Sequence, residues 1–382
     1  MIYLDYAATT PMTDEVLQIY HQVSKSFFGN PSSLHDTGSK ARLLLEKSRE
    51  ELATLLSGLK SGIYFTGGGS EANNLALSSL IDAHKHKGNH LITTASEHAS
   101  VFNFFNLVEQ KGFEVTYLSG DENGVIRLDD VKQAIRETTI LVSIQHGNGE
   151  IGTIQPIAEI GNLLERYGIL FHSDCVQTFG KIPLDVQQMK LDSLSISSHK
   201  IYGPKGMGAV YINPNVKWCP QVPGSTHESG FRPGTENIPG IAAFITAAMT
   251  VCSNMNREEK RLSELKHFLA EELFKRSSRF QVEGEISKSL PHILGISIKG
   301  MEGQYAMLEC NRSGIAISTG SACQTGNQYP SRTMLALGKS DIEAKQFIRL
   351  SFGKQTTKDE IIQTANKLAA MIEKFFPVRS ES

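Results

Sequence analysis

The 382-residue chain has almost no excess charge and no long apolar run. Lys plus Arg total 38 against 40 Asp plus Glu, a net charge of −2, so the sequence offers no broad cationic field for nucleic acid or an anionic membrane. No stretch approaches the roughly 18 uninterrupted apolar residues that span a bilayer. The opening MIYLDYAATT lacks the basic and apolar regions of a secretory signal. We therefore expect a cytoplasmic protein that contacts neither nucleic acid directly nor a membrane.

Cysteine, metal and nucleotide motifs are also scarce. The 5 cysteines form no C-x-x-C pair and no disulfide framework. None of the 12 histidines sits with acids or cysteines at a convincing zinc spacing. The chain contains neither the dinucleotide fingerprint G-x-G-x-x-G nor the phosphate loop G-x-x-x-x-G-K-[ST]. We therefore expect no catalytic metal and disfavour a nucleotide-binding protein.

Short apolar runs alternate with amphipathic segments from about residue 62 to 212, which predicts β-α-β units and a mostly parallel sheet. The first of these helices is expected to have Ser70 as its N-cap and Gly88 as its stop. A stretch rich in Pro and Gly at 213–240 predicts a functional loop, and a long charged helix begins near Asn256. We expect a large α/β domain at 15–258 and a smaller α/β domain made of 1–14 and 259–382.

Two charged residues stand where strands of such a sheet end. Lys200, in SISSHKIYGPKG, lies at the edge where open α/β sheets bind ligands, and a lysine there can form an imine, although a lone lysine is more often solvated. Asp174 follows the apolar strand ILFHS, which predicts burial. A buried carboxylate needs a cationic partner, such as the protonated ring nitrogen of pyridoxal phosphate, whereas an exposed strand-end acid needs none.

Three further features are candidates for chemistry. The segment TGGGSE at 66–71 is either a phosphate cup at a helix N-terminus or a plain glycine-rich turn. His98 and His199 follow strands and are either acid-base groups or ordinary strand-end histidines. Cys323, in ISTGSACQTGN, reads as an exposed loop thiol capable of nucleophilic attack. The remaining cysteines have apolar or helical surroundings that favour structural roles; they are Cys175, Cys219, Cys252 and Cys310.

Taken in order, these segments resemble the cysteine desulfurases of the NifS/IscS type, pyridoxal phosphate enzymes of fold type I, the aspartate-aminotransferase fold. The resemblance covers nearly the whole chain. It runs through LDYAATTP, GNPSSLH, FTGGGSEANN, SEHAS, GNGEIG, HSDCVQTFGK, SSHKIYGPKG, FRPGTEN, STGSAC and IRLSFG. The implied architecture is a large domain with a mostly parallel sheet and a small α/β domain that carries the catalytic cysteine loop.

The resemblance also implies a role for each matching residue. Lys200 would bind the cofactor as an imine and move the substrate's α-proton, and Cys323 would accept the sulfur. Asp174 would face the ring nitrogen, while His98 would stack on the ring. Gln177 and Asn148 would contact the ring's phenolic oxygen or the substrate, and Arg349 would clamp the substrate carboxylate. The phosphate would be held by Gly69, Ser70, Ser197 and His199, joined by Thr235 from a partner subunit.

The implied activity is removal of sulfur from L-cysteine, giving L-alanine and a persulfide on Cys323. The implied partners are a second copy of the chain and a sulfur acceptor such as an iron-sulfur scaffold or a tRNA-thiolation enzyme. A selenocysteine lyase or an aminotransferase of the same fold is the alternative, because fold and cofactor do not fix the reaction. A noncatalytic sulfur carrier that kept the fold would not need this full set of residues.

Overall fold

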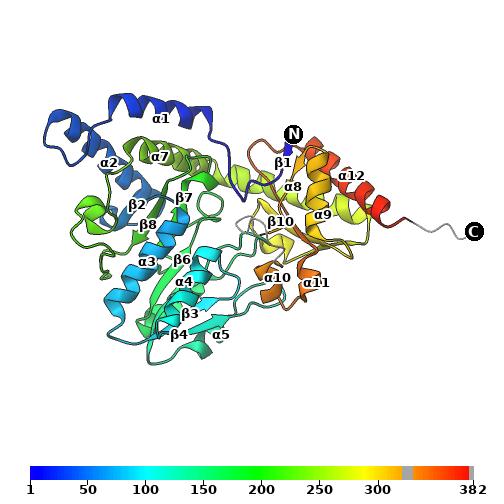
Figure 1. Ribbon diagram of the computed structural model, residues 1–382, viewed down its shortest axis with the longest axis horizontal. Helices are drawn as coiled ribbons and strands as arrows, with labels where there is room; N and C mark the ends of the chain where they lie inside the picture. Colours follow the sequence, from blue (N-terminus) through cyan, green and yellow to red (C-terminus); the bar gives the residue numbers. More distant parts are fainter. Residues whose placement is uncertain (321–329, 378–382) are drawn as a thin grey trace, which may run out of the picture.

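The computed structural model describes residues 1–320 and 330–377. Its main feature is a seven-stranded sheet of order β2-β8-β7-β6-β5-β3-β4 (Figure 1). The pairs among β4, β3, β5, β6 and β7 are parallel, whereas β8 is antiparallel to both of its neighbours. The strands are β2 (Ile63–Thr66), β3 (His90–Thr94), β4 (Glu114–Leu118), β5 (Thr139–Ser143), β6 (Leu170–Asp174), β7 (Ser193–Ser197) and β8 (Gly208–Ile212). The expected mostly parallel sheet is confirmed.

Alternation of side chains along these strands creates two cores. Leu141 packs on one face with α3 and α4, while its neighbour Val142 packs on the other with α2, α6 and α7. Because both faces are covered, the strands read as continuous apolar runs. The helices of this half are α1 (Asp14–Ser26), α2 (Asp36–Leu55), α3 (Gly69–His84), α4 (Ala99–Gln110), α5 (Leu128–Ala134), α6 (Ile157–Tyr167) and α7 (Ile238–Ser253), with short 3₁₀ turns η1 (Lys60–Gly62), η2 (Ser198–Lys200) and η3 (His227–Gly230).

A separate core fills the other half of the molecule (Figure 1). It joins the sheet β12-β10-β9 to α8, α9 and α12 and includes Leu4 from the start of the chain. Strand β1 (Ile2–Tyr3) pairs with β11 (Ile315–Ala316), which holds the N-terminus in this half. The other elements are α8 (Met255–Arg276), β9 (Phe280–Val282), η4 (Ile286–Lys288), β10 (Ile293–Ile298), α9 (Gly303–Arg312), α10 (Arg332–Ala336), α11 (Asp341–Ala344), β12 (Phe347–Ser351) and α12 (Lys358–Phe375). The domain boundary at 258/259 stays a prediction and falls in the first turn of α8.

Two helix boundaries differ from the expected ones. Ser70 is not an N-cap, since α3 begins at Gly69 and its N-cap is Gly68. Gly68 has φ 147°, a conformation that glycine adopts without steric cost, so the chain turns here without a side-chain cap. The same helix ends at His84 rather than near Gly88. The start of α3 is therefore set by backbone conformation and not by the expected capping side chain.

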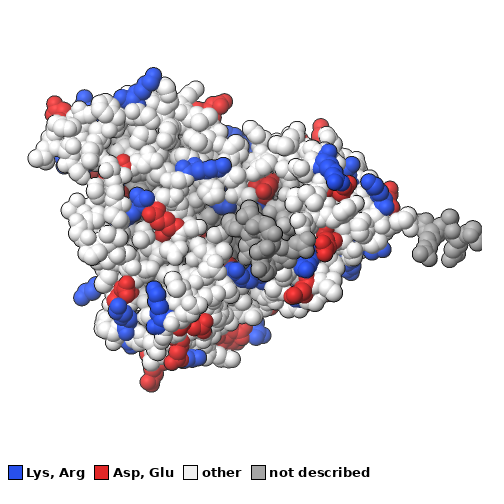
Figure 2. All heavy atoms as spheres, in the orientation of Figure 1, with Lys and Arg blue, Asp and Glu red and all other residues white. Residues whose placement is uncertain are grey.

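Charges of both signs are interspersed over the face of the molecule shown in Figure 2. This distribution accords with the near-zero net charge of the whole chain. Within the described ranges no single helix is long and apolar enough to cross a membrane. Helices α7 and α8 reach that length and hydropathy only together, across a bend of 70°.

A buried ion pair fastens α2 and the edge strand β2 to the loop that follows β8. The Arg49 guanidinium reaches the Glu228 carboxylate in a bidentate pair, with N-O distances of 2.8 and 3.1 Å. The backbone N-H of Phe65 also donates to Glu228, at 2.8 Å. Both side chains are nearly inaccessible, with 11% of Arg49 and 2% of Glu228 exposed. Removing either partner would strand a buried charge.

We expect Arg49→Met to lower the free energy of unfolding by about 3 kcal/mol, because it leaves the Glu228 carboxylate buried without a cation. The control is Lys60→Met, which removes the exposed ion pair between Lys60 and Glu46 and should cost less than about 1 kcal/mol. Urea unfolding of both variants measures the difference. Equal, small effects would show that the Arg49–Glu228 pair does not hold this region together.

Candidate active site

A cavity of about 600 Å³ lies at the carboxyl edge of the large sheet, the edge where open α/β sheets bind ligands. Its walls come from segments that follow β2, β3, β5, β6 and β7, because the carboxyl ends of these strands meet at one edge. The other half of the molecule closes it with Arg349 and with residues of α10. Nearly all the residues that the sequence singled out line this one cavity; they are Gly69, Ser70, His98, Asn148, Asp174, Gln177, Ser197, His199, Lys200 and Arg349.

Lys200 enters the cavity from η2, the single turn that follows β7. Its Nζ donates hydrogen bonds to the backbone carbonyls of Ala7, at 2.6 Å, and Ala8, at 2.9 Å. These carbonyls belong to the segment that follows β1, so the start of the chain positions the amine. These hydrogen bonds fix the amine at a defined point of the cavity wall.

Asp174 ends β6 and is 7% exposed, in line with the burial that its strand predicts. Its Oδ2 accepts from Asn73 Nδ2 at 2.7 Å, and its Oδ1 accepts from the backbone N-H of Val176 at 2.9 Å. Both of these donors are N-H groups of the protein. Across residues 1–320 and 330–377, no cationic side chain lies within ion-pair distance of it. A cationic group of a ligand would complete this buried charge.

The segment after β2 forms a cup around the start of α3. A Cβ on Gly69 would meet Val176 Cγ2 at 2.7 Å and Ser197 Cβ at 3.3 Å, so only glycine fits there. The Ser197 hydroxyl is buried and has no hydrogen-bond partner in the described part of the chain. Because α3 carries no side-chain cap, its first backbone N-H groups are available to an anion as well. This combination fits a phosphate group.

The two candidate histidines differ in their surroundings. Burial, together with the charges of Lys200 and Lys205, lowers the pKa of His199 to about 4, so its ring is neutral at pH 7. His199 Nδ1 lies 3.1 Å from Thr9 Oγ1. His98 is the exposed N-cap of α4, and its Nδ1 accepts from the backbone N-H of Ser100 at 3.2 Å. His98 lines the cavity with its Nδ1 already engaged as an acceptor.

Arg349, on β12, is 4% exposed and already has partners on two of its nitrogens. Nη1 donates to the carbonyl of Gly149 and Nη2 to Asp5 Oδ1, both at 2.8 Å. Its Nε has no partner among the described residues, so the guanidinium keeps an available donor. The sequence did not single out Asp5, although it lies in the LDYAATTP segment; nothing local to it announces a partner 344 residues away.

Asn148 and Gln177 also line the cavity, but their amides are engaged within the protein. Asn148 Oδ1 accepts from the N-H groups of Glu150 and Ile151, and its Nδ2 donates to Ser96 O and Thr333 Oγ1. Gln177 Nε2 donates to the Ala7 carbonyl at 3.1 Å. Asn148 thus shapes the turn after β5, and its contact with a ring or substrate stays a prediction.

Two predicted residues are not brought to this cavity within one chain. Thr235 is exposed and does not line it. Cys323 lies outside the described residues. Burial raises the pKa of Cys175 and Cys310 to about 12 and that of Cys252 to about 11, so these three thiols remain protonated at neutral pH. They are poor nucleophiles, as their structural surroundings predicted.

The fold and the cavity together define an enzyme of the class-V aminotransferase family, and the model of that family, "Aminotransferase class-V", matches residues 2–363. Relatives narrow the class. The chain is 49% identical over 375 residues to "Putative cysteine desulfurase NifS" of Bacillus subtilis (strain 168), covering 98% of this chain and 95% of that protein. It is 41% identical over 373 residues to "Cysteine desulfurase IscS" of Dictyoglomus turgidum (strain DSM 6724 / Z-1310), covering 98% and 95%.

Solved structures agree with these relatives. A "NIFS-LIKE PROTEIN" superposes with a TM-score of 0.91 at 31% identity, over 98% of this chain and all of that one. A structure titled "SspA in complex with cysteine" superposes with a TM-score of 0.81 at 34% identity, over 92% and 99%. The chain belongs to the cysteine desulfurases of the NifS/IscS type, and the expected fold type I is confirmed.

Enzymes of this family use pyridoxal phosphate, and the Ser197 hydroxyl gives a direct test of where its phosphate binds. We expect Ser197→Ala to weaken the affinity of the apoprotein for pyridoxal phosphate by roughly tenfold, the effect of one hydrogen bond to a charged group. Ser195→Ala is the matched control, since Ser195 Oγ on the same strand is also buried without a described partner but does not line the cavity. Absorbance titration of both apoproteins measures the affinity. Equal affinities would place the phosphate elsewhere.

Proposed function

We propose that this enzyme removes the sulfur of L-cysteine, releases L-alanine and holds the sulfur as a persulfide on Cys323. The observation that carries the proposal concerns the described residues that precede and follow the segment of Cys323 in the sequence. Gly320 and Pro330, the described residues on either side of it, both line the cavity that holds Lys200.

The residues of the cavity fit pyridoxal phosphate. The cup of Gly69, Ser70, Ser197 and His199 would take the phosphate, and Asp174 would face the ring nitrogen. Lys200 would hold the cofactor covalently and His98 would cover its ring. When bound, this cofactor accepts the electron pairs that the reaction places on carbon.

Arg349 would bind the substrate carboxylate. Its guanidinium is held by Asp5 and Gly149 and keeps Nε available, so a carboxylate would find a donor that is already oriented. Lys200 would then move the proton of the substrate's α-carbon, since its Nζ is the amine fixed in the cavity. Prior orientation of both groups lowers the entropy lost on binding.

Cys323 would carry out the sulfur transfer. Its thiolate attacks the substrate sulfur, so that a new S-S bond forms and the Cβ-S bond breaks with its electron pair on carbon. A proton delivered to that carbon completes L-alanine. Atoms and electrons balance, because one thiol and one L-cysteine become one persulfide and one L-alanine.

We further propose that the enzyme acts as a homodimer and passes its sulfur to an iron-sulfur scaffold or a tRNA-thiolation enzyme. Exposed apolar side chains around α1 and α2 support a dimer: Phe28 is 72% exposed, Leu34 92% and Leu43 71%. Thr235 is exposed on its own subunit, as a residue that reaches a partner's phosphate cup must be.

Replacing the sulfur-accepting thiol tests the proposed function. In Cys323→Ser we expect cofactor binding and folding to persist, while alanine production and persulfide formation fall to background, because a hydroxyl is a poor nucleophile toward sulfur. Cys219→Ser is the control, since Cys219 is the one described cysteine whose thiol is not shown to be silenced by burial. Alanine is quantified after addition of L-cysteine, and the persulfide is located by peptide mass. Alanine release at the wild-type rate in Cys323→Ser would assign the sulfur transfer to another group.

A further inference from the structure

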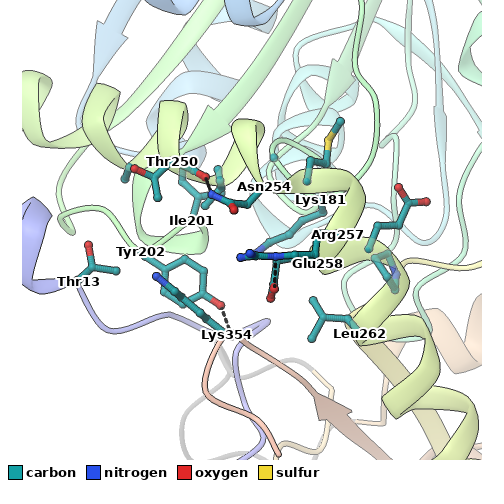
Figure 3. Close-up of a pocket in the computed structure, with 16 residues that line it drawn as sticks. Thr13, Lys181, Ile201, Tyr202, Thr250, Asn254, Arg257, Glu258, Leu262 and Lys354 are labelled. Atoms are coloured by element: carbon teal, nitrogen blue, oxygen red, sulfur yellow. Dashed lines mark hydrogen bonds and ion pairs between the residues drawn. The ribbon is translucent and has the colours of Figure 1, made fainter.

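A second cavity, of about 70 Å³, lies where α7 bends into α8, against Tyr202 and Lys354 (Figure 3). It shares no lining residue with the active-site cavity. Its inner wall is apolar and is formed by Ile201, Ala247, Val251, Leu262 and Pro291. A space of this size holds about five water-sized groups, so it suits a small molecule and excludes a peptide.

Lys181 contributes a cation to this pocket and makes no ion pair in the described part of the chain, although the charge of Glu258 acts on it from a greater distance. It follows β6 and contributes its side chain to the pocket, where its Nζ lies 5.1 Å from the centroid of the Tyr202 ring. Burial lowers its pKa to about 8. Within the described ranges, the Lys181 ammonium makes no hydrogen bond and no ion pair. The charge of Glu258 offsets only part of this desolvation. A partly desolvated ammonium over an aromatic ring therefore still gains from an anion directly beside it.

The two carboxylates that line the pocket, Glu258 and Glu259, lie beyond ion-pair distance of the Lys181 ammonium in the described structure. Glu258 forms an ion pair with Arg261, in which Arg261 Nη2 lies 2.8 Å from Glu258 Oε2. Its other oxygen, Oε1, lies 3.8 Å from Arg257 Nε. Glu259 also lines the pocket but lies beyond ion-pair distance of Lys181 in the described structure. Arg257 and Lys354 add two more cations at the exposed rim. The charged side chains that line the pocket therefore carry a net positive charge, next to an apolar wall.

We infer that this pocket is a binding site for one small oxyanion, such as a phosphate, a sulfate or a short-chain carboxylate, which pairs with the Lys181 ammonium. Two residues of this pocket, Tyr202 and Lys354, lie close in sequence to residues of the active site. Tyr202 follows Lys200 by two residues, and its hydroxyl accepts from the backbone N-H of Lys354 at 2.7 Å. Lys354 in turn follows Arg349 by five residues on the chain. An anion that fixes Lys181 against Tyr202 would thus stabilise the contact between these two segments.

The test is calorimetric titration of the holoenzyme, whose cofactor already fills the phosphate cup, with sulfate, phosphate and acetate in separate experiments. We expect one saturable site per chain and roughly tenfold weaker binding in Lys181→Met, which keeps volume but removes the charge. Lys132→Met, on an exposed cation of α5, should bind as the wild type does. Tighter binding of sulfate and phosphate than of acetate identifies a tetrahedral oxyanion, and the reverse order identifies a carboxylate.

A second variant keeps Lys181 and fills the cavity with a larger side chain. Ala247 is 1% exposed and lines the pocket, so Ala247→Leu should also abolish anion binding. If Lys181→Met does not fold, this variant alone decides. Titrations that are the same in the wild type and in both pocket variants, or the absence of any saturable site in the wild type, would overturn the inference. The readout involves no sulfur transfer, so it is independent of the proposed function.

Discussion

The hydrogen bonds from the Lys200 ammonium to the carbonyls of Ala7 and Ala8 are the contacts on which the site depends. They belong to a short segment, residues 5–10, that passes along the cavity wall. Thr9 of this segment contacts His199, and Asp5 pairs with Arg349. The chain start therefore links the lysine on the large sheet to the arginine on β12, in the other half of the molecule. Strand β1, which precedes this segment, is itself held in place by its pairing with β11.

Charged residues of both signs line the cavity; they are Glu97, Glu150, Asp174, Asp341, Lys200, Arg332 and Arg349. Asp174 is buried among N-H donors and offers a single negative charge. Its neighbour Glu97 does not add a second one at pH 7, since burial, with the charge of Asp174 contributing, raises the pKa of Glu97 to about 8. Arg349 and Arg332 supply positive charge from the other half of the molecule. A cationic ring nitrogen of a cofactor would be complementary to Asp174, and the carboxylate of a substrate would be complementary to Arg349.

Most of the sheet could be predicted from sequence, because strands buried on both faces are continuous apolar runs such as ILVS and GAVYI. The long helix expected near Asn256 begins at Met255, and Thr357 caps α12 as its Thr-x-x-Glu pattern allows. The sequence pattern does not predict helix α7, because its apolar residues lie on all sides and show no helical periodicity. Likewise, the pairs of Lys200 with Ala7 and of Arg349 with Asp5 join residues remote in sequence, which no local pattern reveals.

The proposed active site is tested most directly by determining which residue forms the covalent bond to the cofactor. The purified enzyme is reduced with borohydride, which fixes an imine as a stable amine, and is then digested and mapped by mass. The account predicts one pyridoxyl group per chain, on Lys200, which lines the same cavity as Asp174 and the phosphate cup. A pyridoxyl group on Lys205 or Lys181, or its absence from every peptide, would contradict it.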